Sequence, residues 1–406
     1  MTSLSRKTTR VGLQGCLDAS LIQTSPAEPL NATTSQEAYA PHALAKGNLT
    51  PTRIGRKVIS MKTNRVPVVD AEGKPLMPTT PARVRLLLKA GKAVARWNKL
   101  GVFYIQLKTA KQPNNQPLAI GVDPGSKFEA ISVVGTKDTV LNVMSETVTW
   151  VKNAVKQKRQ MRRSRRGRKT RCRACRRNRL GRSLPPSTRA RWNAKLRIIG
   201  QLQKILPIQT AVVEDVKAWA KLGQKRWNAS FSPLETGKRY FYGQLERMGL
   251  TVVLKQGYET KKLRRQYHLK KTRQKSAKTF ESHCVDSWVL AASETGAKHP
   301  CRSFYYLVPF RWHRRQLHRL QPKHGVRRRY GGTQLLGLKR GTLVRHVKYG
   351  LCHVGGSLKE KFSLHSVKTG KRLTQTAERD SFKVLTKVAF RTQFLPALKS
   401  GVSLEA

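Results

Sequence analysis

The sequence predicts a mixed α/β protein, of α/β or α+β type, in which strands and helices build packed layers. Three strand candidates follow one another between residues 118 and 148, separated only by turn residues, which is typical of antiparallel strands. From residue 188 to about 300, segments of helical period alternate with short apolar segments of strand type. A chain of 406 residues is long enough for two or three domains.

The charge balance predicts the kind of partner. The chain has 82 Lys and Arg against 21 Asp and Glu, which gives a formal net charge of +61. An excess of this size repels itself in a compact protein and predicts a polyanionic partner. No stretch reaches the roughly 18 apolar residues of a membrane span, so we expect no membrane partner. Six scattered cysteines fit a reducing compartment better than a disulfide scaffold.

The N-terminal segments differ in composition from the rest of the chain. Residues 1–60 are rich in Ser, Thr, Ala and Pro without a sustained period, which predicts a disordered extension. Patterned sequence begins after Met61, which could instead be the start of the functional protein. Residues 61–112 predict a small unit with a strand at 66–69, the tetrapeptide Pro75-Leu76-Met77-Pro78, a helix at 81–92 and a strand at 102–107.

The later elements follow the same signals. Strands are expected at 118–123, 129–134, 140–148, 210–213 and 251–254. Helices are expected at 192–206, where Pro207 ends the pattern, and at 240–248 and 281–295. From about residue 302 the chain is basic and rich in Gly, with strand candidates at 342–348 and 382–390, which predicts a small β-rich module.

Acidic residues are scarce, so their positions are informative. Asp123 ends one apolar strand and precedes Pro-Gly, and Glu214 ends another apolar strand. Asp286 is expected on a helix, with His283 three residues before it and therefore on the same face. If these elements are neighbours, the three carboxylates form one anionic pocket whose oxygen ligands suit Mg²⁺ or Mn²⁺.

Such a pocket is typical of enzymes that cut phosphodiesters. Two metal ions about 3.5–4 Å apart activate water and stabilise the attacking and the leaving oxygen. Each acid alone has a simpler interpretation, with Asp123 as a turn residue, Glu214 as a strand end and Asp286 as a surface acid. His283 could be a metal neighbour or general base, or an ordinary helix histidine. The order of the three acids on these elements favours the catalytic interpretation.

Several motifs together resemble a known family. Ile120-Gly121-Val122-Asp123-Pro124-Gly125, Val212-Val213-Glu214 and His283-Cys284-Val285-Asp286 resemble the three split motifs of a RuvC-type nuclease in the RNase H fold. The arginine-rich segment between the first two motifs resembles the bridge helix of RNA-guided nucleases. Pro75-Leu76-Met77-Pro78 resembles the namesake motif of the PLMP domain. This combination, over roughly Met61 to the C-terminus, resembles the transposon-encoded IscB and IsrB proteins.

One absence separates these two relatives. IscB-like proteins carry an HNH nuclease between the second and third RuvC motifs. Here only 286 − 214 = 72 positions separate Glu214 from Asp286, and His268 is the only histidine between Asp215 and Ser282. A ββα-metal site needs more histidines and more room. The chain is therefore similar to IsrB, although Ser287 stands where that family often has Ala.

The resemblance implies a domain organisation and an activity. The expected parts are the extension at 1–60, a PLMP-like domain at 61–112, RuvC part I at 117–150, an arginine-rich bridge helix at 151–187, RuvC part II at 188–220, RuvC part III at 221–300 and a basic target-motif-interacting module at 301–406. The implied activity is RNA-guided nicking of one DNA strand, the non-target strand, by a RuvC site with Asp123, Glu214, His283 and Asp286. The implied partners are a guide noncoding RNA and double-stranded target DNA, in a monomeric ribonucleoprotein.

Three basic segments are candidates for nucleic-acid contacts, at 158–182, at 261–271 just before the third acidic motif, and at 311–329. From Lys158 to Arg182 there are twelve Arg and two Lys, and no Asp or Glu occurs between Thr147 and Val213. A helix with arginine on every face cannot rest against a core, so we expect it to bind phosphates. A solvated basic tail is the simpler alternative. The predicted nucleic-acid-binding residues are Arg162, Arg163, Arg165, Arg166, Arg168, Arg171, Arg173, Arg176, Arg177, Arg311, Arg314, Arg315, Arg327, Arg328 and Arg329.

Aromatic and cysteine residues within these segments have two interpretations each. Trp312 and Tyr330 lie among arginines, where they could stack on bases or simply pack within the β-rich module. Cys172 and Cys175 have metal-ligand spacing, but a structural zinc needs four ligands and no second pair is present. We therefore expect no zinc site.

Two other functions remain open at this point. The same pocket could serve a guide-independent, structure-selective nuclease, or the RuvC-like fold could be a scaffold for a non-catalytic nucleic-acid-binding protein. In each case we expect a cytoplasmic bacterial protein that associates with the nucleoid through DNA.

Overall fold

A computed structural model describes residues 65–112, 114–167, 184–215, 234–310, 334–358 and 360–397. Several predictions lie outside these residues: the disordered extension at 1–60, the Cys172–Cys175 pair, Trp312 and Tyr330. The same holds for the predicted nucleic-acid-binding residues Arg168, Arg171, Arg173, Arg176, Arg177, Arg311, Arg314, Arg315, Arg327, Arg328 and Arg329. Among the helices in the described ranges, none combines the length and apolarity needed to cross a bilayer.

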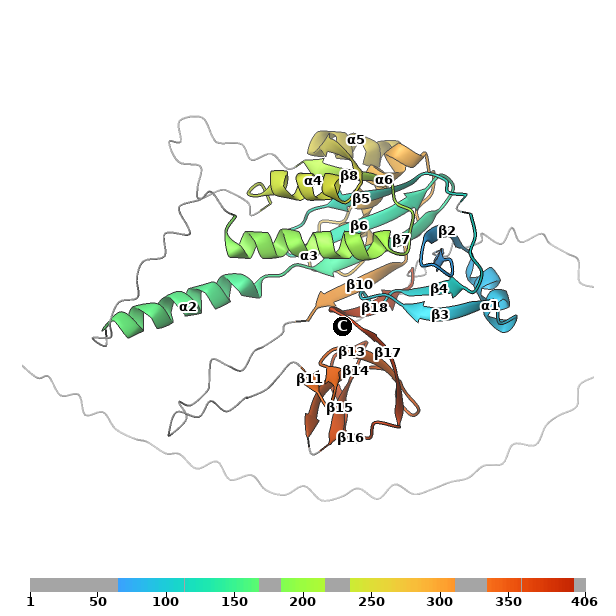
Figure 1. Ribbon diagram of the computed structural model, residues 1–406. Helices are drawn as coiled ribbons and strands as arrows, with labels where there is room; N and C mark the ends of the chain where they lie inside the picture. Colours follow the sequence, from blue (N-terminus) through green and yellow to red (C-terminus); the bar gives the residue numbers. More distant parts are fainter. Residues whose placement is uncertain are drawn as a thin grey trace, which may run out of the picture. The chain divides into compact units, whose positions relative to one another are not determined.

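The first described part is a four-stranded sheet with one helix (Figure 1). Its elements are β1 (Val66–Val69), β2 (Pro75–Thr79), α1 (Pro81–Lys89), β3 (Ala93–Trp97) and β4 (Phe103–Leu107), in the sheet order β2-β1-β4-β3. Thr80 caps α1 by accepting a hydrogen bond from the Arg83 amide, and Pro81 begins the helix. The helix ends before the predicted residue 92, because Gly91 adopts a φ of +65° and β3 begins at Ala93.

A seven-stranded mixed sheet forms the centre of the chain. Its strands are β5 (Leu118–Asp123), β6 (Phe128–Gly135), β7 (Thr139–Glu146), β8 (Thr210–Asp215), β9 (Thr251–Gln256), β10 (Phe304–Pro309) and β18 (Phe390–Leu395), in the order β18-β10-β7-β6-β5-β8-β9. The strands β5, β6 and β7 are antiparallel neighbours, whereas β8 runs parallel to β5 and β9 runs parallel to β8. The predicted run of three antiparallel strands and the mixed α/β class are confirmed.

Helices cover both faces of this sheet. The helices α3 (Pro186–Gln203) and α4 (Lys238–Arg247) lie on one face, and α6 (Val285–Thr295), with α5 (Gly257–Gln266) packed against it, lies on the other. The helix α2 (Trp150–Gly167) follows β7 and contacts α3, and its described side chains are mostly exposed. Alternate residues of β5 point to opposite faces. On one face, Leu118, Ile120 and Val122 belong to the core cluster of α3 and α4, while on the other face Ala119 belongs to the cluster of α6. The helices expected at 192–206 and 240–248 are present, but α3 begins six residues earlier and ends three residues earlier than predicted, and α4 begins two residues and ends one residue earlier. The helix α5 was not predicted.

Close packing of α6 on β5 depends on a glycine. A Cβ atom at Gly121 would lie 1.9 Å from the carbonyl oxygen of Ser287 and 2.8 Å from the amide nitrogen of Ala291. No other residue type would allow the helix backbone to approach the strand this closely without a shift. Because Gly121 is two residues before Asp123, this contact places the start of α6 beside the end of β5.

The C-terminal part contains a second sheet. Its strands are β13 (Thr342–His346), β14 (Gly350–Leu358), β15 (Lys361–Ser366), β16 (Arg372–Ala377) and β17 (Phe382–Lys387), in the order β16-β15-β14-β13-β17, with a two-stranded ribbon of β11 (Gln334–Leu335) and β12 (Leu338–Lys339). Val344, Val354 and Phe362 are in its core. The predicted strand at 382–390 is two strands, β17 and β18. Because β10 and β18 belong to the central sheet, the chain between residues 301 and 406 contributes to two sheets rather than forming only a separate module.

Candidate functional site

Two neighbouring strands bring the first pair of acidic residues together. The strands β5 and β8 are parallel, with Val122 opposite Val213, so their carboxyl ends meet at the same edge of the sheet. Asp123 follows Val122 as the last residue of β5, and Glu214 follows Val213 on β8. The sequence therefore places both carboxylates at one edge as soon as these strands pair.

The helix α6 adds the third acid. Asp286 is the second residue of this helix, and the Gly121 contact holds the helix against β5. The carboxylates of Asp123, Glu214 and Asp286 each offer an oxygen atom, and these atoms lie within 4.8 Å of one another. Asp286 is buried, whereas Asp123 and Glu214 are partly accessible. Three side chains that are far apart in the sequence thus form one acidic cluster.

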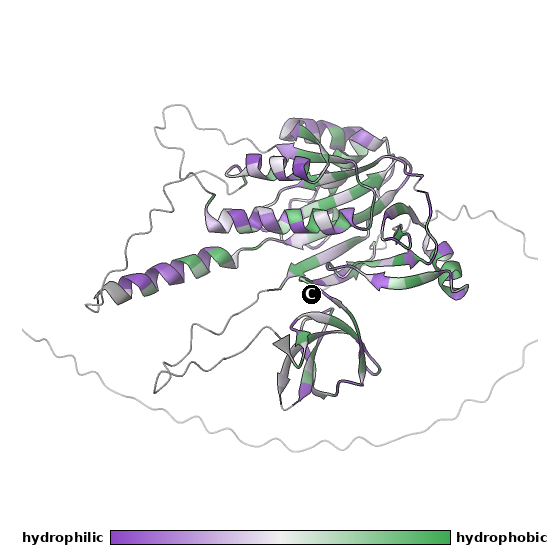
Figure 2. Cartoon of the chain, viewed as in Figure 1, coloured by the Kyte–Doolittle hydropathy of each residue, from purple (hydrophilic) through white to green (hydrophobic). Residues whose placement is uncertain are grey.

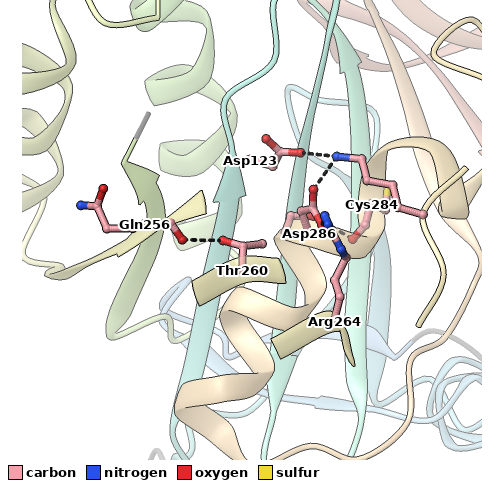
Figure 3. Close-up of polar contacts among 8 residues, drawn as sticks. Asp123, Gln256, Thr260, Arg264, Cys284 and Asp286 are labelled. Carbon is pink, nitrogen blue, oxygen red and sulfur yellow. Dashed lines mark hydrogen bonds and ion pairs between the residues drawn. The ribbon is translucent and has the colours of Figure 1, made fainter. Parts of the chain in front are cut away.

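Two cations lie against this cluster. The Arg264 guanidinium, on α5, donates to Oδ1 of Asp286 at 2.5 Å. The Lys271 ammonium donates to Oδ2 of Asp286 and lies 3.6 Å from Oδ2 of Asp123. Figure 3 shows Asp123 and Asp286 close to one another, with Arg264 approaching Asp286 from below. The cluster is therefore partly neutralised by side chains of the same chain.

Crowding of the carboxylates changes their protonation. Burial, followed by the charges of Asp123 and Asp286, raises the pKa of Glu214 to about 8. Burial also raises the pKa of Asp123, and the Lys271 charge opposes this effect. Three carboxylates this close cannot all ionise without a compensating cation. A divalent ion would supply that charge and displace the proton from Glu214.

The donor set fits a hard divalent cation. Mg²⁺ and Mn²⁺ prefer carboxylate oxygens, and the acidic cluster presents three carboxylates with an ammonium already among them. Asp123, Glu214 and Asp286 are the residues that could hold such an ion.

His283 lies next to the cluster but not within it. It belongs to a π-helical segment, η1 (Phe280–Cys284), so it does not keep the α-helical spacing to Asp286 that the sequence suggested. The imidazole ring packs against Phe128 with 4.8 Å between ring centroids, and its buried Nε2 has no hydrogen-bond partner among the described residues. Burial and the nearby Lys271 charge lower the pKa of His283, so the ring is neutral at pH 7. Its catalytic role stays a prediction.

Some polar residues of the site were not predicted individually. The sequence marks residues 261–271 as a basic cluster before the third motif, but it cannot show that Arg264 and Lys271 reach Asp286. Lys195 and Glu129 were missed entirely. Their side chains form an ion pair of 2.5 Å between α3 and β6, with only 1% of each exposed. Burial, and to a smaller extent the charge of Asp123, raises the pKa of Glu129, while the Lys195 charge opposes this effect.

The acid that follows Glu214 has a different environment. Asp215 accepts hydrogen bonds from Lys238 and Tyr242 at 2.8 and 3.0 Å. Successive residues of a strand point to opposite faces, so Asp215 is directed away from the cluster. Its role is to join β8 to α4.

The basic helix α2 carries the described part of the first arginine segment. Arg162 and Arg163 are exposed on it, and Arg165 and Arg166 lie within its range. Figure 2 shows mainly hydrophilic residues along this helix and hydrophobic residues along the strands of the central sheet. The exposure of Arg162 and Arg163 leaves them accessible to a polyanion.

Comparisons with known proteins give two matches. A family model described as "RRXRR protein" matches residues 66–228, and Arg162 to Arg166 within this range read Arg-Arg-Ser-Arg-Arg. Among solved structures, T. thermophilus RuvC in complex with a Holliday junction substrate is similar, with 10% sequence identity and a TM-score of 0.27 over 45% of this chain and 97% of that chain. No curated protein matches the chain.

Proposed function

We propose that the chain is a Mg²⁺- or Mn²⁺-dependent DNA endonuclease with one RuvC-type site. The observation that carries this proposal is the convergence of Asp123, Glu214 and Asp286, with carboxylate oxygens within 4.8 Å of one another. Three carboxylates this close repel one another, and burial adds to the cost of their charge, so a bound cation would stabilise the group. A highly basic protein that holds divalent metals is suited to act on nucleic acid.

The arrangement of the central sheet supports the RuvC-type assignment. Three antiparallel strands are followed by two strands parallel to the first, in the order β7-β6-β5-β8-β9, and the acids come from β5, β8 and α6. This is the arrangement expected of an RNase H-like fold. The match to the RRXRR family model covers residues 66–228, a range that contains β5, β8 and two of the three acids.

Each residue of the site has a role in this proposal. Asp123, Glu214 and Asp286 hold the metals and His283 assists as general base. When bound, the metals supply activation of water and stabilisation of the charge on the phosphate. Arg264 fixes one oxygen of Asp286, so that the carboxylate keeps its orientation. Burial of Asp286 limits access of bulk water to that side of the site.

A single site of this type would nick one strand. We propose that the guide is a noncoding RNA and that the target is double-stranded DNA, bound by a monomeric ribonucleoprotein in the bacterial cytoplasm. The exposed arginines of α2 would contact phosphates of the guide RNA or of the RNA–DNA duplex. The C-terminal module would contact the motif beside the target.

The first experiment tests the metal-dependent cleavage. Asp123→Asn removes one charge of the cluster while keeping the side-chain shape, so cleavage in Mg²⁺ should be lost and nucleic-acid binding should survive. Glu246→Gln, at an exposed carboxylate of α4, is the matched control and should cut like the parent. If the parent cuts no DNA in the presence of its RNA, the chain is a non-catalytic binding protein.

The second experiment tests RNA guidance. The protein is purified from its host, and the RNA bound to it is sequenced. One discrete noncoding species supports guidance, whereas random fragments favour a guide-independent, structure-selective nuclease. Cleavage of a junction without added RNA would support that second candidate directly.

A further inference from the structure

Lys271 lies against two of the three carboxylates that form the acidic cluster. Its ammonium lies 3.6 Å from Oδ2 of Asp123 and also contacts Oδ2 of Asp286. These two carboxylates supply oxygens to the acidic cluster, whose ligand atoms are within 4.8 Å of one another. A metal ion at about 2.1 Å from the same oxygens would be close to the ammonium. The two cations would therefore repel one another strongly at that distance.

The Arg264 guanidinium does not compete with a metal ion for the same carboxylate oxygen. It binds Oδ1 of Asp286, the oxygen that Lys271 does not use, and it lies on a helix that packs against α6. Tyr267, just after that helix, packs edge-on against Trp288 of α6 with ring centroids 5.3 Å apart. Lys271 lies beyond the end of α5, in a segment without helix or strand. Of the two cations, Lys271 is therefore the one that can move away from the carboxylates while the helices α5 and α6 stay in place.

The Lys271 side chain is also accessible enough to bind a second anion, such as a DNA phosphate. About one third of its side chain, 34%, is accessible to solvent. A lysine ammonium is a compact charge on a flexible four-carbon stem, so it can exchange one oxygen partner for another nearby. A DNA strand at the metals brings phosphate oxygens to this place. An ammonium displaced from the carboxylates would then pair with a phosphate instead of being left without a counterion.

We propose that Lys271 is a resident cation that competes with the divalent metal in the protein without DNA and transfers to a DNA phosphate when the metal binds. This inference rests on the proposed nuclease site and adds a coupling to it. Because metal and DNA each favour the state in which Lys271 has left the carboxylates, each increases the affinity of the other. The site would then load its metals mainly when a strand is present.

The experiment measures Mn²⁺ affinity by the electron paramagnetic resonance signal of free Mn²⁺, with and without a short single-stranded DNA. The oligonucleotide alone is titrated in parallel, because DNA binds Mn²⁺ itself. Without DNA, Lys271→Met should bind Mn²⁺ roughly tenfold more tightly than the parent. With DNA, the parent affinity should rise toward that of Lys271→Met, which should change little.

Two further variants make the result specific. Lys270→Met removes the adjacent exposed lysine, for which the described residues show no ion pair, and it should behave like the parent. Lys271→Arg keeps the charge and should retain the coupling to DNA. Far-ultraviolet circular dichroism establishes that each variant is folded before titration.

The possible results separate this inference from the proposed function. Equal Mn²⁺ affinity of the parent and Lys271→Met, or weaker binding by Lys271→Met, would overturn the competition while leaving the metal site in place. If neither protein binds Mn²⁺ with or without DNA, the metal site itself is wrong and the inference is overturned with it. A tenfold change in Lys270→Met as well would show that only general charge matters, which also overturns the inference.

Discussion

Glu214 lies between two other carboxylates, and this position determines its protonation. Burial and the charges of Asp123 and Asp286 raise its pKa from an ordinary value of 4.5 to about 8. The folded protein therefore keeps a proton on Glu214 at neutral pH when no metal is bound. A divalent cation reverses this preference, because it favours the ionised carboxylate.

This protonation predicts a pH dependence of stability. Between about pH 4.5 and pH 8, the folded chain holds a proton on Glu214 that the unfolded chain has released. The contribution of Glu214 to the free energy of unfolding therefore falls as pH rises through this range. In EDTA, the melting temperature of the parent should fall more between pH 5 and pH 8 than that of Glu214→Gln, which cannot ionise. Identical slopes for the two proteins would contradict the raised pKa.

At the scale of elements, the site depends on one helix lying directly on one strand. The chain achieves this with Gly121 on β5, where even a methyl group would meet the backbone of α6 at 1.9 Å. The distance between Asp123 and Asp286 therefore depends on a residue that has no chemical function.

A substitution at this contact tests that dependence. Gly121→Ala should lower the free energy of unfolding by about 1–3 kcal/mol, because overpacking forces the backbone to shift. It should also weaken Mn²⁺ binding, since α6 carries Asp286 away from β5. The control is Gly243→Ala within α4, where a Cβ meets nothing within 4 Å and should add up to about 1 kcal/mol of stability. Urea denaturation and Mn²⁺ titration measure both effects, and parent-like values for Gly121→Ala would refute the packing argument.

Many of these elements could be predicted from the sequence because their period is local. Short apolar segments, the turn residues between them and the helical period of α3 depend on residues that are close together in the chain. The end of β5 at Asp123 is as predicted, whereas β8 continues to Asp215, two residues beyond the predicted strand at 210–213. The convergence of the acids was expected from the resemblance to RuvC-type nucleases. The π-helical turn at Phe280–Cys284 and the helix α5 were not predicted. For α5 the sequence does carry end signals, since Glu259 in the first turn forms a capping box with Gln256 and the last turn is basic. The contacts of Arg264 and Lys271 with Asp286 depend on the packing of α5 against α6, which the sequence alone does not show.

At the scale of the whole molecule, a large positive charge surrounds a small acidic site. The net charge of +61 favours contact with any polyanion, while the acidic cluster selects the place where metals bind. The division of residues 301–406 between the central sheet and the second sheet could not be read from composition. The strands β10 and β18 pair with one another, although about 80 residues separate them. Long-range pairing of this kind leaves no periodic signal.

The charge distribution predicts a steep dependence of nucleic-acid binding on salt. Arg162 and Arg163 are exposed on α2, so replacing both by Ala should lower affinity for an RNA–DNA duplex and reduce the slope of log K against log salt by roughly 0.7–0.9 for each lost phosphate contact. Replacing both by Lys keeps the charge and should keep the slope. Fluorescence anisotropy over a salt series measures this. An unchanged slope in the Ala variant would mean that α2 does not contact phosphates.

The central claim is that Asp123, Glu214 and Asp286 together hold divalent metal. Crystals of the protein soaked in Mn²⁺ test it most directly, through the anomalous scattering of the ion. We predict anomalous density about 2.1 Å from carboxylate oxygens of all three residues, with Lys271 displaced from Asp123. Density elsewhere on the protein, with none at these three carboxylates, would contradict the claim.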